Sequence, residues 1–142
     1  MTDIVVVLRK LALLREHVQR VRRRRPHTAA ALAADVDILD ALSMSLLVAV
    51  QETVDVAFHL CADESWGVPA SYAESFDVLA RHGILSDELA RRLSGTTALR
   101  NRLAHGYASA DVERLWTELP HGLEALEEFA SAVAGWLGRD ER

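Results

Sequence analysis

Hydrophobic residues recur at three- and four-residue steps along nearly the whole chain, which is the period of an amphipathic helix. The first such segment starts at Ile4 and ends at Arg22–Arg25, because Pro26 has no N–H with which to continue a helix. A longer helix is predicted from Thr28 to Ala62, with an apolar face wide enough for a central position. The two stripes predicted to face the core are Ile4, Leu8, Leu11, Leu14, Val18 and Val21, then Leu32, Val36, Leu39, Leu42, Leu46, Val50, Val54 and Phe58.

The second half of the chain predicts three further helices. Ser71 and Glu74 form a capping box that starts a short helix ending before Gly83. Ser86 caps the next helix, in which Gly95, Thr96 and Thr97 are weak helix formers. Their predicted core residues are Tyr72, Phe76 and Leu79, then Leu89, Leu93, Leu99 and Leu103.

Asp111 is predicted to cap the last helix, and Pro120 to kink or break it, since proline clashes with the carbonyl four residues back. Gly122 supports a break at this point. The core stripe of this helix is Val112, Leu115, Leu119, Leu123, Leu126, Val133 and Leu137, with added bulk from Trp116, Phe129 and Trp136.

These segments predict an all-α fold, namely an antiparallel helical bundle of four long helices and one short helix. With 142 residues, of which 50% are hydrophobic, the chain is long enough to bury a core as a single domain over residues 1–142. Glycine and proline are scarce, as expected for an ordered helical protein.

The formal net charge of −5 argues against a general nucleic-acid coat, although it allows a local basic site. Cys61 is the only cysteine, so we expect no internal disulfide, a place for Cys61 in the core and a reducing, cytoplasmic setting. The most apolar run, residues 42–50, is shorter than the about 20 residues that span a bilayer, so no membrane segment is predicted. Arg9 and Lys10 interrupt the apolar start, which therefore does not resemble a signal peptide.

Charged clusters in the first half have two possible interpretations. The basic run Arg22–Arg25 fits a solvated helix C-terminus better than a phosphate contact. Acidic residues in the second predicted helix fit a solvated face better than metal ligands, because no histidine is placed to match them. These residues are Asp35, Asp37, Asp40, Glu52 and Asp55.

The densest polar chemistry lies between Leu99 and Tyr107. On a helix, Leu99 and Leu103 share a core-facing side, whereas Asn101 and His105 share another side, with Arg102 one turn from His105. Arg100 lies five positions before His105, roughly 140° around an ideal helix. This stretch could be an ordinary helix end, since glycine often follows a last turn and basic side chains suit it. It could equally be a site for RNA chemistry, and the residues alone leave both readings open.

Several motifs in order nevertheless resemble one known family. Arg100-Asn101-x-Leu103-x-His105-Gly106-Tyr107 resembles the Arg-x4-His-x-Tyr signature of HepT-like toxins in the HEPN ribonuclease superfamily. Upstream, Pro69-Ala70-Ser71-Tyr72 with Phe76, and Leu79 with Gly83-Ile84, resemble two further segments of that family. The resemblance implies a HEPN-like bundle and a toxin ribonuclease of a type VII-like toxin–antitoxin pair.

Histidine suits a general base that takes the 2′-hydroxyl proton of RNA, and arginine suits the charge on the phosphate. The resemblance therefore makes Arg100 and His105 catalytic, with Asn101 supporting them and Arg102 binding RNA. Since one histidine cannot be base and acid at once, we expect a homodimer with a shared cleft. The family implies no metal or cofactor.

The same resemblance implies a partner, a nucleotidyltransferase antitoxin of the MntA type. Such an enzyme would attach AMP to Tyr107, two residues from His105, and the added anion would repel RNA. The alternative is a non-catalytic helical module that binds RNA or that partner. Accessibility of His105 and Arg100 separates these two hypotheses.

Overall fold

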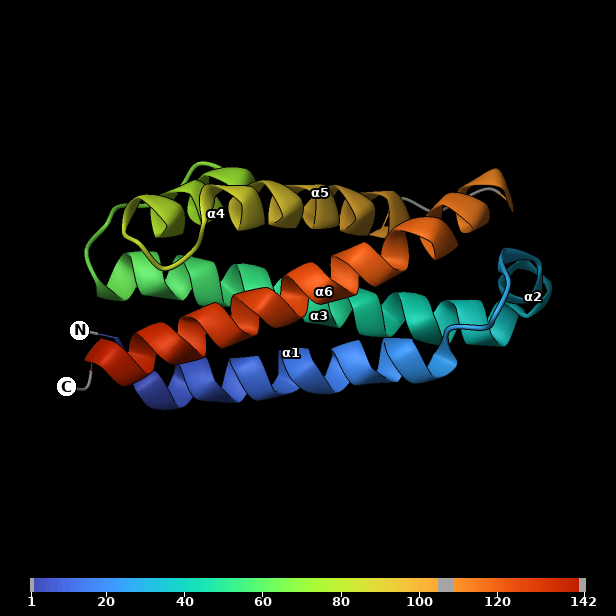
Figure 1. Cartoon of the computed structure of the whole chain (residues 1–142), viewed down its shortest axis with the longest axis horizontal. Coiled ribbons are helices and arrows are strands. Elements are labelled where there is room, and N and C mark those ends of the chain that lie inside the picture. The colour runs from blue at the N-terminus through green and yellow to red at the C-terminus, as the bar shows by residue number, and fades with distance from the viewer. Residues whose placement is uncertain (1, 105–108, 141–142) are drawn as a thin grey trace.

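The structure is a computed structural model that describes residues 2–104 and 109–140, and within them it consists of α-helices without strands. Four helices are long and run antiparallel along the bundle (Figure 1). The predicted all-α bundle is therefore confirmed, with one more short helix than expected. The helices are α1 (Ile4–Arg24), α2 (Ala29–Ala34), α3 (Val36–Asp63), α4 (Tyr72–Arg81), α5 (Asp87–Ala104) and α6 (Ser109–Asp140).

The single helix predicted from Thr28 to Ala62 is wrong, because the chain breaks at Asp35. Thr28 Oγ1 accepts the N–H of Ala31 at 3.1 Å and thereby caps α2 alone. Asp35 has extended backbone angles (φ −121°, ψ 95°), and its Oδ1 accepts the N–H of Ile38 at 3.1 Å. Asp35 is thus the N-cap of α3 and not part of a solvated acidic face, since aspartate is among the best N-capping residues.

The central helix is α3, which contacts α1, α2, α4, α5 and α6. By length and composition α3 could cross a membrane, yet 56% of its most apolar 18-residue window is buried inside the bundle. Cys61 lies fully buried on this helix as a free thiol, as predicted. Burial raises the pKa of the Cys61 thiol, although the charge of Arg81 and a backbone hydrogen bond act in the opposite direction.

The core follows the predicted stripes with two exceptions. Leu8 is 49% exposed, whereas Val7 is fully buried, because the spacing Val7–Leu11–Leu14 keeps one side against α3. Val36 is 64% exposed, since it is the first residue of α3 after the break at Asp35. Phe76 and Phe129 meet edge to face in the core, with ring centroids 6.1 Å apart.

Two of the predicted caps are present. Ser71 Oγ accepts the N–H of Glu74 at 3.1 Å, and the Glu74 carboxylate accepts the N–H of Ala70 at 3.0 Å. Ser86 Oγ accepts the N–H of Leu89 at 3.0 Å and so starts α5. Ser71, Glu74 and Ser86 therefore act as predicted, with one difference. The Glu74 carboxylate bonds the N–H of the residue before the N-cap, whereas a standard capping box bonds the N–H of the N-cap itself.

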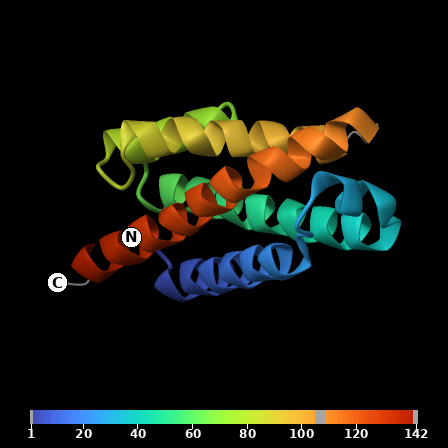
Figure 2. The same cartoon turned by 45° about the vertical axis from the view of Figure 1, so that its right-hand side comes forward.

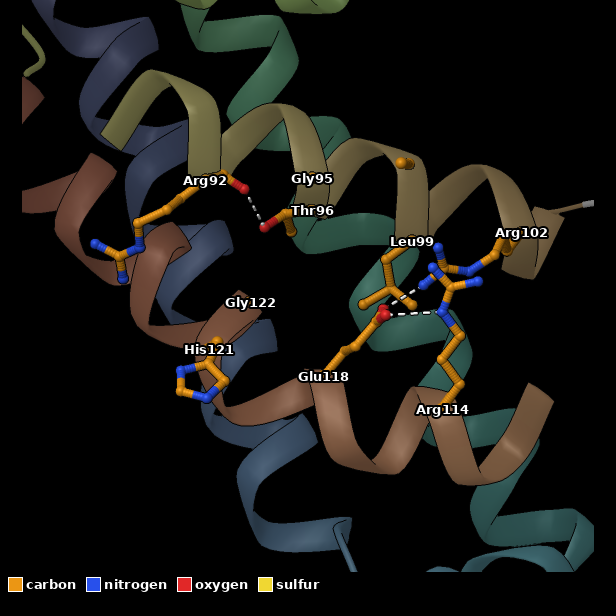
Figure 3. Close-up of a pocket in the computed structure, with 10 residues that line it drawn as sticks. Arg92, Gly95, Thr96, Leu99, Arg102, Arg114, Glu118, His121 and Gly122 are labelled. Carbon is orange, nitrogen blue, oxygen red and sulfur yellow. Dashed lines mark hydrogen bonds and ion pairs between the residues drawn. The ribbon is translucent and has the colours of Figure 1, made fainter. Parts of the chain in front are cut away.

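The start of α6 differs from the prediction, whereas its middle shows one of the two outcomes predicted at Pro120, a kink and not a break. Asp111 is not its cap, because α6 begins at Ser109 and Asp111 lies in the first turn, where negative charge is favourable. Pro120 does not break the helix, which continues through it to Asp140. Instead the helix axis changes direction near His121 and Gly122 (Figure 3), as expected where one backbone hydrogen bond is missing.

Candidate functional site between α5 and α6

The last turn of α5 is held on the core by two leucines. Leu99 and Leu103 are 3% and 8% exposed, as their four-residue spacing predicted. Gly95, Thr96 and Thr97 do not interrupt α5, because the hydroxyls of both threonines bond carbonyls of the preceding turn. Arg100, Asn101 and Arg102 therefore belong to the end of a continuous helix.

Arg100 is half-buried and Asn101 is exposed on this last turn. The Arg100 Nη1 atom donates a hydrogen bond to Asn101 Oδ1 at 3.2 Å. Among the described residues, no carboxylate lies within ion-pair distance of Arg100, so its guanidinium is not neutralised there. The other two predicted site residues, His105 and Tyr107, lie outside the described residues.

Arg102 lies in a different environment, because it forms an ion pair with Glu118 on α6 (Figure 3). Arg114, one turn before Glu118, donates from Nε to the same carboxylate at 2.8 Å. Burial acts to raise the pKa of Glu118, but hydrogen bonds and positive charge from Arg114 and Arg102 outweigh it and lower the pKa. Glu118 is thus a carboxylate shared by two arginines.

Sequence reasoning missed Glu118 and Arg114. The one local signal was their four-residue spacing on a helix, which favours an ion pair. The contact with Arg102 depends instead on how α5 packs against α6, which no local pattern reports.

A groove of about 330 Å³ opens between α5 and α6 beside this cluster (Figure 3). Its walls carry Arg92, Arg102, Arg114 and His121, and its floor is formed by small and apolar residues. The floor residues are Gly95, Thr96, Ala98, Leu99 and Gly122.

The basic run at the end of α1 lies near the same end of the bundle. The guanidinium of Arg25 stacks on the ring of Trp116 at 4.1 Å and donates to its backbone carbonyl at 3.1 Å. Trp116 Nε1 in turn donates to the carbonyl of Pro26 at 2.9 Å. Arg22 pairs with Glu127 on α6. Arg22, Arg23 and Arg24 are exposed, as predicted for a solvated helix end, whereas Arg25 is partly buried against Trp116.

Most of the chain matches one known protein family. Residues 14–133 match the family described as Ribonuclease HepT-like, which is more than four-fifths of the chain. The chain belongs to the HepT-like ribonuclease family. The HepT-like segment includes α5, the groove and the positions of His105 and Tyr107.

Two HepT relatives are named as nucleases. The mRNA nuclease HepT of Shewanella oneidensis is 23% identical over 128 residues, covering 90% of this chain and 96% of that protein. The tRNA nuclease HepT of Aphanizomenon flos-aquae is 25% identical over 87 residues, covering 61% of this chain and 59% of that protein.

A solved HepT-like structure shows the same fold. It is the tri-AMPylated HEPN toxin of Shewanella oneidensis in complex with MNT antitoxin, with a TM-score of 0.83 and 22% identity. The similarity covers 95% of this chain and 99% of that chain. The predicted HEPN-like bundle is thereby confirmed.

Proposed function

We propose that this protein is the toxin of a toxin–antitoxin pair, a metal-independent endoribonuclease with Arg100 and His105 as catalytic residues. It acts on RNA in the cytoplasm, where the unpaired thiol of Cys61 stays reduced. Support comes from membership of the HepT-like ribonuclease family and from two relatives named as RNA nucleases.

One observation carries the choice of site. Arg100 lies near the C-terminal end of α5, and no described carboxylate neutralises its guanidinium. Arg102, two residues further along, is paired with Glu118. A guanidinium without an internal counter-ion is suited to bind the phosphate of a substrate. Arg100 therefore stabilises the charge that develops on the phosphate oxygens.

The reaction is an attack of the RNA 2′-oxygen on the adjacent phosphorus. His105 accepts the 2′-hydroxyl proton, the new P–O2′ bond forms, and the P–O5′ bond breaks. His105 of a second copy donates a proton to the leaving 5′-oxygen, so the products carry a 2′,3′-cyclic phosphate and a 5′-hydroxyl. This division of roles is why the enzyme works as a homodimer.

Asn101 has a narrower role in this proposal than the sequence suggested. Its Oδ1 accepts the Arg100 Nη1–H at 3.2 Å, so Asn101 is a positioning residue that orients the guanidinium. Arg102 is expected to bind RNA through the groove between α5 and α6 and not at the reacting phosphate.

The partner is a nucleotidyltransferase antitoxin that transfers AMP from ATP to the Tyr107 hydroxyl with release of pyrophosphate. A related toxin is tri-AMPylated in complex with MNT antitoxin, which supports this partner. An adenylate two residues after His105 adds negative charge where RNA phosphate would bind, and so repels the substrate.

The test is cleavage of single-stranded RNA by the purified protein in the presence of EDTA. We expect 2′,3′-cyclic phosphate ends, and loss of cleavage in Arg100→Ala and in His105→Ala. Arg91→Ala is the matched control, because Arg91 is exposed on the same helix and does not line the groove. Equal cleavage by all four proteins would overturn the site, and binding without any cleavage would favour the non-catalytic module.

A further inference from the structure

The groove between α5 and α6 is basic in an acidic protein. Three arginines and one glutamate line it, Arg92, Arg102, Arg114 and Glu118, whereas the whole chain carries a formal net charge of −5. Arg92 also pairs with Glu128, which lies outside the lining. A concave surface with excess positive charge attracts anions even on a protein of opposite net charge.

Glu118 does not exhaust the donors of its two arginines. It accepts from Nη2 of Arg102 and from Nε of Arg114, which is one of the five N–H groups on each guanidinium. The side chains of Arg102 and Arg114 are 32% and 58% exposed, so both forks remain open to solvent. Two guanidinium groups beside one carboxylate carry one net positive charge, which is available to bind a phosphate.

Small residues keep the floor of the groove open. A Cβ placed on Gly95 would meet no atom within 4 Å, so the space above Gly95 is empty. Across the groove, a Cβ on Gly122 would lie 3.7 Å from Thr96 Cγ2 and 3.9 Å from Leu99 Cδ2, so the two helices approach closely there. The resulting volume of about 330 Å³ lies at the small end of ligand-binding sites.

We infer that this groove binds one nucleotide of a single-stranded RNA, with its phosphate between Arg102 and Arg114 and its base over the Gly95–Leu99 floor. The inference rests on the proposed ribonuclease function and adds a second contact for the same substrate. Arg102 lies two positions after Arg100 on α5, so both arginines of this substrate contact belong to the same helix.

The experiment measures binding of a 12-nucleotide fluorescein-labelled 2′-O-methyl RNA, which cannot undergo 2′-oxygen attack, by fluorescence anisotropy over a salt series. Gly95→Leu adds a side chain to a residue that lines the groove, at a position where the new Cβ meets no atom within 4 Å. Gly135→Leu is its matched control, since Gly135 is also helical, exposed and free of neighbours within 4 Å, but lies in α6 away from the groove. Arg114→Gln is compared in the same way with Arg91→Gln.

We expect Gly95→Leu to weaken RNA binding about tenfold or more, whereas Gly135→Leu leaves the Kd unchanged. Arg114→Gln should weaken binding about tenfold, as for one lost charge-assisted contact. It should also reduce the slope of log K against log salt by about 0.7, the value for one phosphate on a single strand. Thermal unfolding of each variant checks that its fold is intact.

Unchanged Kd values and salt slopes in Gly95→Leu and Arg114→Gln would overturn the groove. A lower cleavage rate with unchanged RNA binding would also overturn it, because the cluster would then only anchor α5 to α6. Binding of the 2′-O-methyl RNA does not depend on cleavage. Failure of the ribonuclease proposal, seen as no cleavage by the unmodified chain, is therefore distinguishable from failure of the groove.

Discussion

Both chain termini lie at the same end of the bundle (Figures 1 and 2), and the two ends are built from different side chains. The end that holds both chain termini is packed with aromatic rings, Trp66, His82 and Trp136, and we term it the aromatic end. Trp66 stacks on His82 with ring centroids 4.0 Å apart, and Trp136 meets Trp66 edge to face at 5.9 Å. His82 is the C-cap of α4, so this stack covers a helix end.

Hydrogen bonds join the N-terminus to the same end. Thr2 Oγ1 donates to Glu64 at 2.8 Å, and the N–H of Asp3 donates to Asp63 at 2.8 Å. Both polar groups of this N-terminal segment are thus matched by groups of the chain itself, which favours stability.

The opposite end is rich in arginines, among them Arg25, Arg100, Arg102 and Arg114, and we term it the basic end. Arg25 and Arg102 are held by Trp116 and Glu118, whereas Arg100 has only the neutral amide of Asn101 among the described residues. The comparison teaches that the proposed catalytic arginine differs from its neighbours in having positive charge without an internal anion among the described residues. A second hollow, of about 410 Å³, differs from the basic end in this respect, because its Lys10 is paired with Glu52 and Asp55.

The largest expected effect is on catalysis at the basic end. Arg100→Ala should lower the rate of RNA cleavage by about 10²–10³-fold, the usual cost of removing one group that stabilises transition-state charge. The free energy of unfolding should change by less than about 0.5 kcal/mol, since Arg100 lies outside the core. Cleavage kinetics and urea unfolding measure the two quantities, and a large loss of stability would show that Arg100 is structural.

The aromatic end should respond in the opposite way. Trp66→Ala removes both ring contacts and should reduce the free energy of unfolding by about 2–3 kcal/mol, while RNA cleavage at 25 °C stays unchanged. Trp66→Phe, which keeps a ring against His82, is the control and should recover part of the loss. Reduced RNA cleavage by a folded Trp66→Ala protein would show that the aromatic end also affects catalysis.

Gly95 allows a smaller change at the groove. Gly95→Ala should raise the free energy of unfolding by about 0.5–1 kcal/mol, because alanine restricts the unfolded chain and no atom lies within 4 Å of the new Cβ. Gly122→Ala should gain at least as much, since its Cβ would make an ordinary van der Waals contact with Thr96 Cγ2 at 3.7 Å. Thermal unfolding of both variants gives the comparison, and a loss of stability in Gly95→Ala would contradict the open floor.

The smallest effect concerns pH. The pKa of Glu118 is lower in the folded protein than in the unfolded chain, so its ion pairs stabilise the fold above the unfolded pKa of about 4.3 and are lost as pH falls through the folded pKa. Because Glu118 is partly exposed, the contribution should be below about 1 kcal/mol. Glu118→Gln should therefore lose less stability than the unmodified protein between pH 6 and pH 3. If the free energies of unfolding of the two proteins changed in parallel with pH, the Glu118 ion pairs would contribute nothing to stability.

Sequence reasoning located the helices best where one helical turn contains the whole signal. The sequence identifies Ser71 and Ser86 as caps from their positions before helical segments, and in the structure each serine accepts an N–H three residues ahead. The same local signal at Asp35 was read as part of a charged face, and the break between α2 and α3 was missed for that reason. At Pro120 the sequence left a kink or a break open, and only the structure shows the kink, since a long helix packed in a bundle tolerates one missing hydrogen bond by bending.

The amino-acid sequence by itself determined the all-α class, the core stripes and the order of the motif from Arg100 to Tyr107, because helix period and caps depend on residues three or four positions apart. Only the tertiary structure decided that Arg102 meets Glu118, 16 residues away on another helix, and that small residues of α5 and α6 enclose a basic groove. Such contacts depend on the register in which two helices pack, and this register is set by the whole core and not by any one segment.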